Sequence, residues 1–407
     1  MARLSEYDAI VVGAGPAGSS AAAVLGAAGK RTLLLDRDRF PREKTCGDGI
    51  TFKCFPALKR LGLLDDFFKA VRVRTRGYSL VFSNGQELAV RQPEGDRAPV
   101  YVLPRYDFDQ LILSAALRER QVQLVSEVRA ESLQFDADKV VGVIGSLKGA
   151  PFEARAPLVI DACGANTPLA VQVGAGNRDP RRCALAIRGY YQGLKGLSDL
   201  IELYFDREIL PGYFWIFPTS PTTANIGCGT FQHLVEERKI DLRAVLRRFF
   251  EQHPVVREKL SGATLCGELK GGKIPLALSP IDAEGSSRVR DGLILVGDAA
   301  SFTDPITAEG ISYALNSGLL AGEVGSAALD RRDLSAESLS PYDSGWRAEF
   351  GRQFARAPVL TTPLSKELFA RQLQKSFEGS TSVDAAVGHL DLQYELMVKL
   401  KVLLKAL

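Results

Sequence analysis

The sequence has few of the residues that build metal centres. Its 407 residues include three histidines and six cysteines, and no two cysteines show the Cys-x-x-Cys spacing of zinc and redox sites. The cysteines are scattered through a long chain, which does not support a disulfide framework. We therefore expect no metal, reduced thiols and a cytoplasmic location.

Strong charge of one sign and long apolar runs are missing as well. The 51 basic and 48 acidic residues leave a net charge of +3, which gives no reason to expect a nucleic-acid partner. No apolar run reaches the roughly 18 residues of a membrane span. Glu6 and Asp8 stand where a signal peptide would carry basic residues. Nothing in the composition sets an oligomeric state.

The C-terminal stretch LMVKLKVLLKAL allows two interpretations. One helical face would carry Leu396, Leu400, Leu403 and Leu407, with Lys401 and Lys405 off that face. In the first interpretation this helix packs on the protein body. In the second it rests on a membrane surface or beside a lipid, which would give the protein a peripheral membrane contact.

A dinucleotide-binding pattern opens the chain. The apolar run AIVV predicts a buried strand, Gly13, Gly15 and Gly18 form Gly-x-Gly-x-x-Gly, and small residues predict a helix after it. A second strand, RTLLLD, ends on Asp36, which can accept hydrogen bonds from a ribose. The helix N-terminus offers free N–H groups to a pyrophosphate. The residues expected at the cofactor are Gly13, Gly15, Ala17, Gly18, Asp36 and Arg37.

A second segment with close backbone approaches lies far downstream. LILVGD predicts a strand that leads to Gly297 and Asp298, and a loop with Pro305 precedes a glycine-rich helix beginning near Gly310 and Ile311. Because the first motif is N-terminal and no second Gly-x-Gly-x-x-Gly follows, resident FAD is favoured over NAD. Asp298 could then hold a ribityl hydroxyl, and the helix start could face a reduced flavin. An ordinary strand–loop–helix crossover is the alternative.

Two further pieces complete a recognisable set. LVIDACGANTPLA predicts a strand ending on Asp161, and YVLPRYDFDQ places Arg105 beside a predicted helix. The set resembles the flavoprotein superfamily of p-hydroxybenzoate hydroxylase. The resemblance implies FAD contacts at Asp161, Arg105, Gly297 and Asp298, although Asp-Ala-Cys-Gly replaces a plain Asp-Gly in the middle motif.

The resemblance implies an α/β fold: a Rossmann-like FAD-binding domain of the p-hydroxybenzoate hydroxylase type, an inserted antiparallel β-sheet substrate domain and a C-terminal helical segment. Alternating residues around Asn84-Gly85 predict a hairpin within the substrate domain. The expected boundaries are 1–71, 102–180 and 285–335 for FAD, 72–101 and 181–284 for substrate, and 336–407 for the helical region. We expect the active site between the first two domains.

Two stretches narrow the resemblance to one family. PGYFWIFP places Tyr213, Trp215 and Phe217 on one face of a predicted strand, either as core packing or as an apolar wall for a hydrophobic or lipid substrate. EKTCGDGI places Cys46 and Gly47 in a glycine-rich loop. Both, with ANIGCG and GDAASFTDPITAEGISYALNSG, resemble the geranylgeranyl reductase family, whose members use FAD to saturate C=C bonds of isoprenoid chains.

That resemblance implies hydride delivery from the flavin and a proton from a nearby acid. Cys46 is the candidate favoured for shaping the flavin face and relaying the proton, and Asp48 is the weaker candidate. A small packed thiol remains the alternative for Cys46. The electron donor would be NAD(P)H or a reduced ferredoxin-like protein. An FAD monooxygenase or dehydrogenase acting on a smaller secondary metabolite, and a non-catalytic FAD- and lipid-binding protein, stay open as alternative functions.

Overall fold

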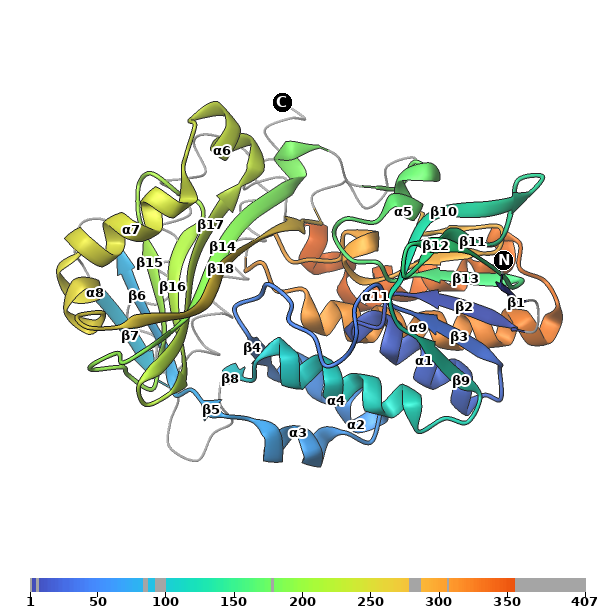
Figure 1. The fold of residues 1–407 in the computed structure, drawn as a ribbon, viewed down its shortest axis with the longest axis horizontal. Coiled ribbons are helices and arrows are strands. Elements are labelled where there is room, and N and C mark those ends of the chain that lie inside the picture. Colours follow the sequence, from blue (N-terminus) through green and yellow to red (C-terminus); the bar gives the residue numbers. More distant parts are fainter. Residues whose placement is uncertain are drawn as a thin grey trace, which may run out of the picture.

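Two large sheets lie side by side in the protein (Figure 1). The computed structural model describes residues 2–4, 7–82, 87–91, 100–176, 179–277, 287–305 and 307–355. The Asn84-Gly85 turn and the leucine-lysine stretch 396–407 lie outside the described residues. Within the described part of the chain, no helix is long and apolar enough to cross a bilayer.

The first sheet has six strands and carries the N-terminal motif. Its order is β19 (Val289–Arg290), β20 (Leu293–Leu295), β13 (Leu158–Asp161), β2 (Ala9–Val12), β3 (Thr32–Leu35) and β9 (Val122–Val125). All pairings except β19–β20 are parallel. The strands β2, β3, β13 and β20 are buried at every position, as expected for short apolar runs covered on both faces.

Helices and a smaller sheet surround these strands. The helices are α1 (Pro16–Ala27), α2 (Phe55–Arg60), α3 (Leu64–Ala70), α4 (Arg105–Leu117), α5 (Pro168–Gln172), α9 (Ile311–Arg331), α10 (Ala336–Leu339) and α11 (Pro341–Ala355). The smaller sheet has the order β1 (Ala2–Leu4), β12 (Ala150–Arg155), β11 (Lys139–Leu147) and β10 (Val128–Asp136). The C-terminal helix α11 packs on α9, and its Tyr342 hydroxyl donates to the Leu295 carbonyl in the sheet.

The second sheet has seven strands and is almost entirely antiparallel. Its order is β18 (Thr264–Pro275), β14 (Cys183–Gln192), β17 (Thr223–Phe231), β16 (Tyr213–Ser220), β15 (Ile201–Phe205), β6 (Gly77–Phe82) and β7 (Glu87–Arg91). The pair β6–β7 confirms the hairpin strands, whereas β15 and β6 pair in parallel. The expected α/β fold class, with its parallel and antiparallel sheets and C-terminal helices, is confirmed.

One face of the second sheet is closed by α7 (Leu242–Gln252) and α8 (Pro254–Lys259), while α6 (Gln232–Glu237) follows the end of β17 and packs in a separate apolar cluster. Asp241 caps α7 by accepting from the Arg243 N–H, and the apolar side of the helix is buried. Phe249 of α7 stacks on Phe214 of β16 at 4.3 Å between ring centroids. Since neighbouring strand residues face opposite sides, Tyr213, Trp215 and Phe217 point away from these helices.

A strap, defined here as residues 43–48, connects the two halves. It leads into β4 (Gly49–Thr51), which pairs with β8 (Val100–Val102), and β8 also pairs with β5 (Val73–Arg74). The strap is followed by the short 3₁₀ helix η1 (Phe52–Cys54). Two other short 3₁₀ helices are η2 (Pro180–Arg182) and η3 (Gly297–Ala300). The strap therefore lies between the parallel sheet and the antiparallel sheet.

Helices α1 and α9 cross closely because glycine stands at their contact. A Cβ added at Gly318 of α9 would lie 2.1 Å from the Ala17 carbonyl oxygen of α1, and one added at Gly322 would lie 2.9 Å from the Ala21 carbonyl oxygen. Atoms never approach that closely, so a side chain at either site would push the helix away. This packing keeps the first glycine loop and the start of α9 together.

We predict that Gly318→Ala destabilises the protein by about 3 kcal/mol, the upper part of the range for overpacking, because the added methyl meets backbone that has no rotamer to change. Urea unfolding followed by circular dichroism measures the change. Ala327→Ser, at an exposed position of the same helix, serves as the control and should change stability by less than about 0.5 kcal/mol. Equal stability of both variants would contradict the tight crossing.

Candidate functional site

The first glycine loop presents free backbone donors. Gly13 has φ +104°, and a Cβ there would lie 2.2 Å from the Ala162 oxygen, so only glycine fits. Gly15 precedes α1, no side chain caps the helix, and Pro16 needs no hydrogen bond from its nitrogen. The amides of the first turn, including that of Ala17, are thus left for a ligand.

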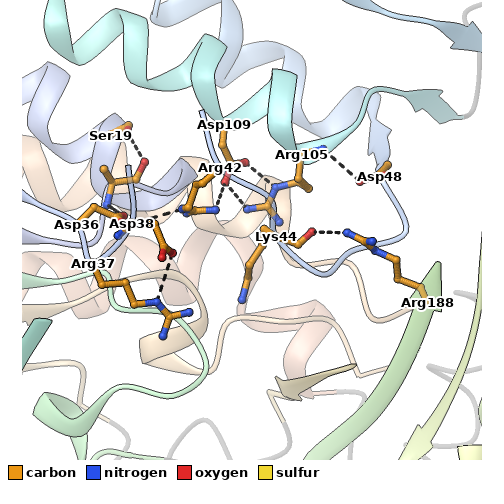
Figure 2. Close-up of polar contacts among 11 residues, drawn as sticks. Ser19, Asp36, Arg37, Asp38, Arg42, Lys44, Asp48, Arg105, Asp109 and Arg188 are labelled. Carbon is orange, nitrogen blue, oxygen red and sulfur yellow. Dashed lines mark hydrogen bonds and ion pairs between the residues drawn. The ribbon is translucent and has the colours of Figure 1, made fainter. Parts of the chain in front are cut away.

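Asp36 lies where β3 ends and is almost fully buried. It accepts from the Ala14 N–H at 2.7 Å and from the Asp38 N–H at 2.9 Å, and each oxygen keeps a second lone pair. Burial raises the pKa of Asp36, while the positive charge of Arg42 counteracts the rise. Arg37, also predicted at the cofactor, has an exposed side chain that contacts Asp38 and turns away from the loop (Figure 2).

A buried chain of charges runs along this side of the structure (Figure 2). Arg42 contacts Asp36 at 3.9 Å and Asp109 at 3.1 Å. Asp109, which is fully buried, takes two bonds from the Arg105 guanidinium at 2.5 and 2.8 Å. The chain thus connects the strand-end acid Asp36 with Arg105 at the start of α4.

Arg42 and Asp109 are the residues of this chain that sequence reasoning missed. The Arg42 guanidinium lies over the Phe40 ring at 4.7 Å, and its Nη2 would be 3.3 Å from a Cβ on Gly15. Arg42 therefore lies across the glycine loop from the α1 amides. No local sequence pattern marked either Arg42 or Asp109 as a residue of the site.

Lys44 adds a third cation to Arg42 and Arg105. Burial lowers the pKa of Lys44, Asp298 opposes this effect, and the two arginines add to it. The Lys44 carbonyl, on the other side of the residue, accepts from Arg188 of β14 at 3.2 Å. Three carboxylates, those of Asp36, Asp109 and Asp298, face these three cations, so the charges along this side of the structure balance.

The two other predicted acids have different surroundings. Asp161, at the end of β13, is fully buried and accepts from the Thr167 hydroxyl at 2.5 Å and the Cys163 N–H at 3.0 Å. It thereby shapes the loop that packs on Gly13. Asp298 in η3 is less buried and accepts from the Thr303 hydroxyl at 3.3 Å. Asp298 is therefore the acid with more capacity left for a ligand.

The loop before α9 lies between the two sheets. Gly297 precedes it with φ +56°, and Pro305 is buried within it. Gly310 precedes α9 and supplies no side-chain cap, so the amides of Ile311 and its neighbours are free at a positive helix end. The Tyr213 hydroxyl of β16 donates to the Thr307 carbonyl at 3.1 Å. This bond ties the antiparallel sheet to the loop.

The strap packs directly on the aromatic strand. Ring centroids are 6.0 Å apart for Tyr213 and Trp215, and 6.4 Å apart for Trp215 and Phe217. A Cβ on Gly47 would be 3.3 Å from the Phe217 ring, and one on Gly49 would be 3.1 Å from it. Gly47 of the strap and Gly49 at the start of β4 thus leave room for the Phe217 ring.

Asp48 is an anchor within the strap. It is fully buried with φ +66°, and its carboxylate accepts from the Tyr190 hydroxyl at 2.6 Å, the Asn225 amide at 2.8 Å and the Arg105 N–H at 3.2 Å. Burial raises the pKa of Asp48, and its hydrogen bonds from Tyr190 and Asn225 oppose the rise. With three donors aimed at it, this carboxyl is an acceptor that holds the strap.

Cys46 is half-buried beside that anchor. Burial raises the pKa of the Cys46 thiol, and the positive charge of Arg105 lowers it only in part. The thiol is therefore uncharged at neutral pH and can give up a proton. Across the described residues, no group of three His, Cys, Asp or Glu side chains is placed to hold a metal ion.

These features fit an extended dinucleotide with a pyrophosphate. The uncapped start of α1 and the cation Arg42 face one another across Gly15. Asp36 lies at one end of the charge chain, and the free start of α9 lies toward the strap. The adenosine of such a dinucleotide would meet the acceptor Asp36. The doubly charged linker would meet the free N–H groups of α1 and the cation Arg42, and the flavin would meet the positive end of α9.

Comparison with known proteins agrees with this interpretation. Residues 6–185 match the FAD binding domain family, and residues 185–264 match the geranylgeranyl reductase catalytic domain. The chain is 33% identical to digeranylgeranylglycerophospholipid reductase 2 of Methanopyrus kandleri, over 86% of this chain and 85% of that protein. It is also 33% identical to menaquinone reductase of Mycobacterium tuberculosis, over 81% and 78% of the two chains.

Solved structures share the fold. A geranylgeranyl bacteriochlorophyll reductase-like protein of Thermoplasma acidophilum superposes with a TM-score of 0.84 at 24% identity, covering 98% of both chains. A flavin-dependent brominase superposes with a TM-score of 0.72 at 22% identity, covering 96% of this chain and 94% of that one. At these sequence identities, both similarities show a shared fold.

We predict that Arg42→Met weakens FAD binding roughly 10- to 100-fold, as expected for the loss of a charge-assisted contact. Fluorescence titration of the stripped protein with FAD measures the dissociation constant. Arg129→Met, at an exposed position on β10, is the matched control and should bind FAD normally. Unchanged affinity in Arg42→Met would remove this guanidinium from the cofactor site.

Proposed function

The chain belongs to the geranylgeranyl reductase family of FAD-dependent oxidoreductases, and from this membership we propose that it reduces C=C bonds in the isoprenoid chain of a lipid-like substrate. The relatives reported above are named for such substrates, a digeranylgeranylglycerophospholipid and a menaquinone. Their common feature is a polyprenyl chain, which is the part we assign to this protein.

The position of Cys46 carries the proposal. The strap places this uncharged thiol beside a strand with three aromatic side chains, and the same strand reaches the loop before α9 through Tyr213. An apolar surface, a proton donor and a flavin site thus meet between the two sheets. An isolated alkene needs that combination, because no carbonyl is present to take up the charge of the incoming hydride.

FAD, when bound and reduced, would supply the hydride for one new C–H bond. We assign the second hydrogen to Cys46, whose S–H bond breaks as a proton passes to the neighbouring alkene carbon. The thiolate left behind is stabilised by the Arg105 charge and the Asp48 N–H, and water returns the proton. Tyr213 and Trp215 contact the chain in this proposal. Asp48, the weaker acid candidate, acts as the anchor of the strap.

We predict that the pre-reduced holoprotein adds two hydrogens to each reduced double bond in the absence of oxygen. Anaerobic incubation with dithionite and either a digeranylgeranylglycerophospholipid or a menaquinone, followed by mass spectrometry, tests this outcome and separates the two substrates. Replacing dithionite by NADPH or by a reduced ferredoxin tests the donor, because a single dinucleotide motif is present in the sequence.

Other outcomes favour other functions. Gain of an oxygen atom in air, without any gain of hydrogen under anaerobic conditions, would contradict the reductase and support a monooxygenase. Binding of lipid and FAD without turnover from any donor would leave a carrier. Oxidation of a smaller substrate by the oxidised holoprotein would support a dehydrogenase.

We predict that kcat stays level up to about pH 8.5, the ordinary pKa of a thiol, and falls only at higher pH. The fall occurs because a deprotonated thiol has no proton to donate, and burial raises the pKa of Cys46. Cys46→Ala should lower kcat roughly 100-fold and abolish this alkaline limb. Cys266→Ala, which removes an exposed thiol, should behave as the wild type. Normal turnover by Cys46→Ala would exclude the thiol from the chemistry.

A further inference from the structure

Asn225 of β17 uses every part of its side-chain amide at the centre of the site. The residue is fully buried. Its oxygen accepts from the Trp215 indole N–H at 3.0 Å, and its nitrogen donates to the Cys46 carbonyl at 2.7 Å and to the Asp48 carboxylate at 2.8 Å. One amide thus connects the aromatic strand with both ends of the Cys46–Asp48 turn.

We infer that Asn225 is a positioning residue of the reductase reaction, which fixes the Cys46 thiol in register with the aromatic strand β16. The inference rests on the proposed function for its chemical consequence. The structural part of the inference, that Asn225 determines where the thiol lies, depends only on the hydrogen bonds of Asn225.

The turn needs this external support because its own geometry is unfavourable. Asp48 adopts the left-handed conformation with φ +66°, which is unfavourable for a residue with a side chain. Gly47 and Gly49 on either side add flexibility. Three donors from separate elements, Asn225, Tyr190 and the Arg105 N–H, converge on the Asp48 carboxylate and hold the turn.

Only an amide can make this set of bonds. An aspartate has the same shape, but when it is ionised it presents acceptors to the Cys46 carbonyl and to the Asp48 carboxylate. The charged and titratable groups around the position are Asp48 and Cys46 of the strap, Arg188 and Tyr190 of β14, and Arg105 of α4. Since the neighbour in contact is a carboxylate, an introduced carboxyl would hold its proton more tightly than usual.

The test uses Asn225→Asp in the FAD-loaded protein. At pH 8 we expect kcat to fall roughly 100-fold with a smaller change in KM, because the thiol is displaced while the apolar surface remains. Below neutral pH the introduced carboxyl regains a proton and can donate again, so kcat should recover as the pH falls. The wild type should lack this acid-side recovery.

Two readouts do not depend on turnover. The rate at which iodoacetamide alkylates Cys46, located by peptide mass spectrometry, should change in Asn225→Asp at pH 8 and return toward the wild-type rate at low pH. The chain has two tryptophans, so tryptophan emission in a Trp346→Phe background reports Trp215. This emission should shift when the amide partner of the indole is charged.

Two variants accompany the test. Thr223→Val removes a partly buried hydrogen bond to Thr219 on the same pair of strands and should leave kcat, alkylation and emission unchanged. Tyr190→Phe removes one donor to Asp48 and keeps the ring under Arg188. It should lower kcat in the same direction by a smaller factor, and it replaces Asn225→Asp as the test if that protein does not fold.

The inference is overturned if the folded Asn225→Asp protein loses activity equally at all pH values while alkylation of Cys46 stays normal. Asn225 would then be an ordinary core residue. Failure of the proposed function gives a different result, because the wild-type protein itself would show no anaerobic reduction. Altered alkylation in Asn225→Asp would in that case still support Asn225 as the residue that positions the thiol.

Discussion

The buried carboxylate of Asp109 organises the cofactor side of the protein. Two guanidinium groups cannot be removed from water without a partner, and Asp109 pairs with both Arg105 and Arg42. Asp109 thereby fixes the position of both arginines. Arg42 lies across Gly15 from the α1 amides, and Arg105 lies near the Cys46 thiol. A single anion thus connects the glycine loop at the start of α1 with the strap that carries Cys46.

The strap connects this group of charges with the antiparallel sheet. Its first residues are held by Arg188, which bonds to Glu43 at 2.7 Å and to the Lys44 carbonyl, and its last by Asp48. Between them the Phe217 ring occupies the space where side chains on the strap glycines would be. The aromatic strand β16 therefore supports the strap, in addition to lining the proposed substrate site. Trp215, bonded to Asn225, belongs to the support, while Tyr213 reaches the loop before α9.

The parts of this arrangement that could be predicted are those encoded by neighbours in the sequence. The Gly-x-Gly-x-x-Gly turn, the buried strands and the alternation of rings on β16 depend on local geometry, and the fold class follows from their order. Arg42, Asp109 and Asn225 could not be found in this way. Asn225 meets Cys46 across 179 residues of sequence, and no local pattern marks such a partner. Long-range polar contacts of this kind exist only once both sheets are assembled.

The fold by itself does not choose between reduction and oxygen-dependent chemistry, since a flavin-dependent brominase shares it at low identity. The distinction lies in what the protein adds beside the flavin site. Chemistry with oxygen needs no proton donor at the substrate carbon, whereas saturating a C=C bond does. In the proposed reaction, the Cys46 thiol, which burial keeps protonated and whose loop is bonded to Asn225, meets that requirement. The neighbouring carboxyl of Asp48 accepts from Tyr190, from Asn225 and from the Arg105 N–H, and is therefore engaged in holding the turn.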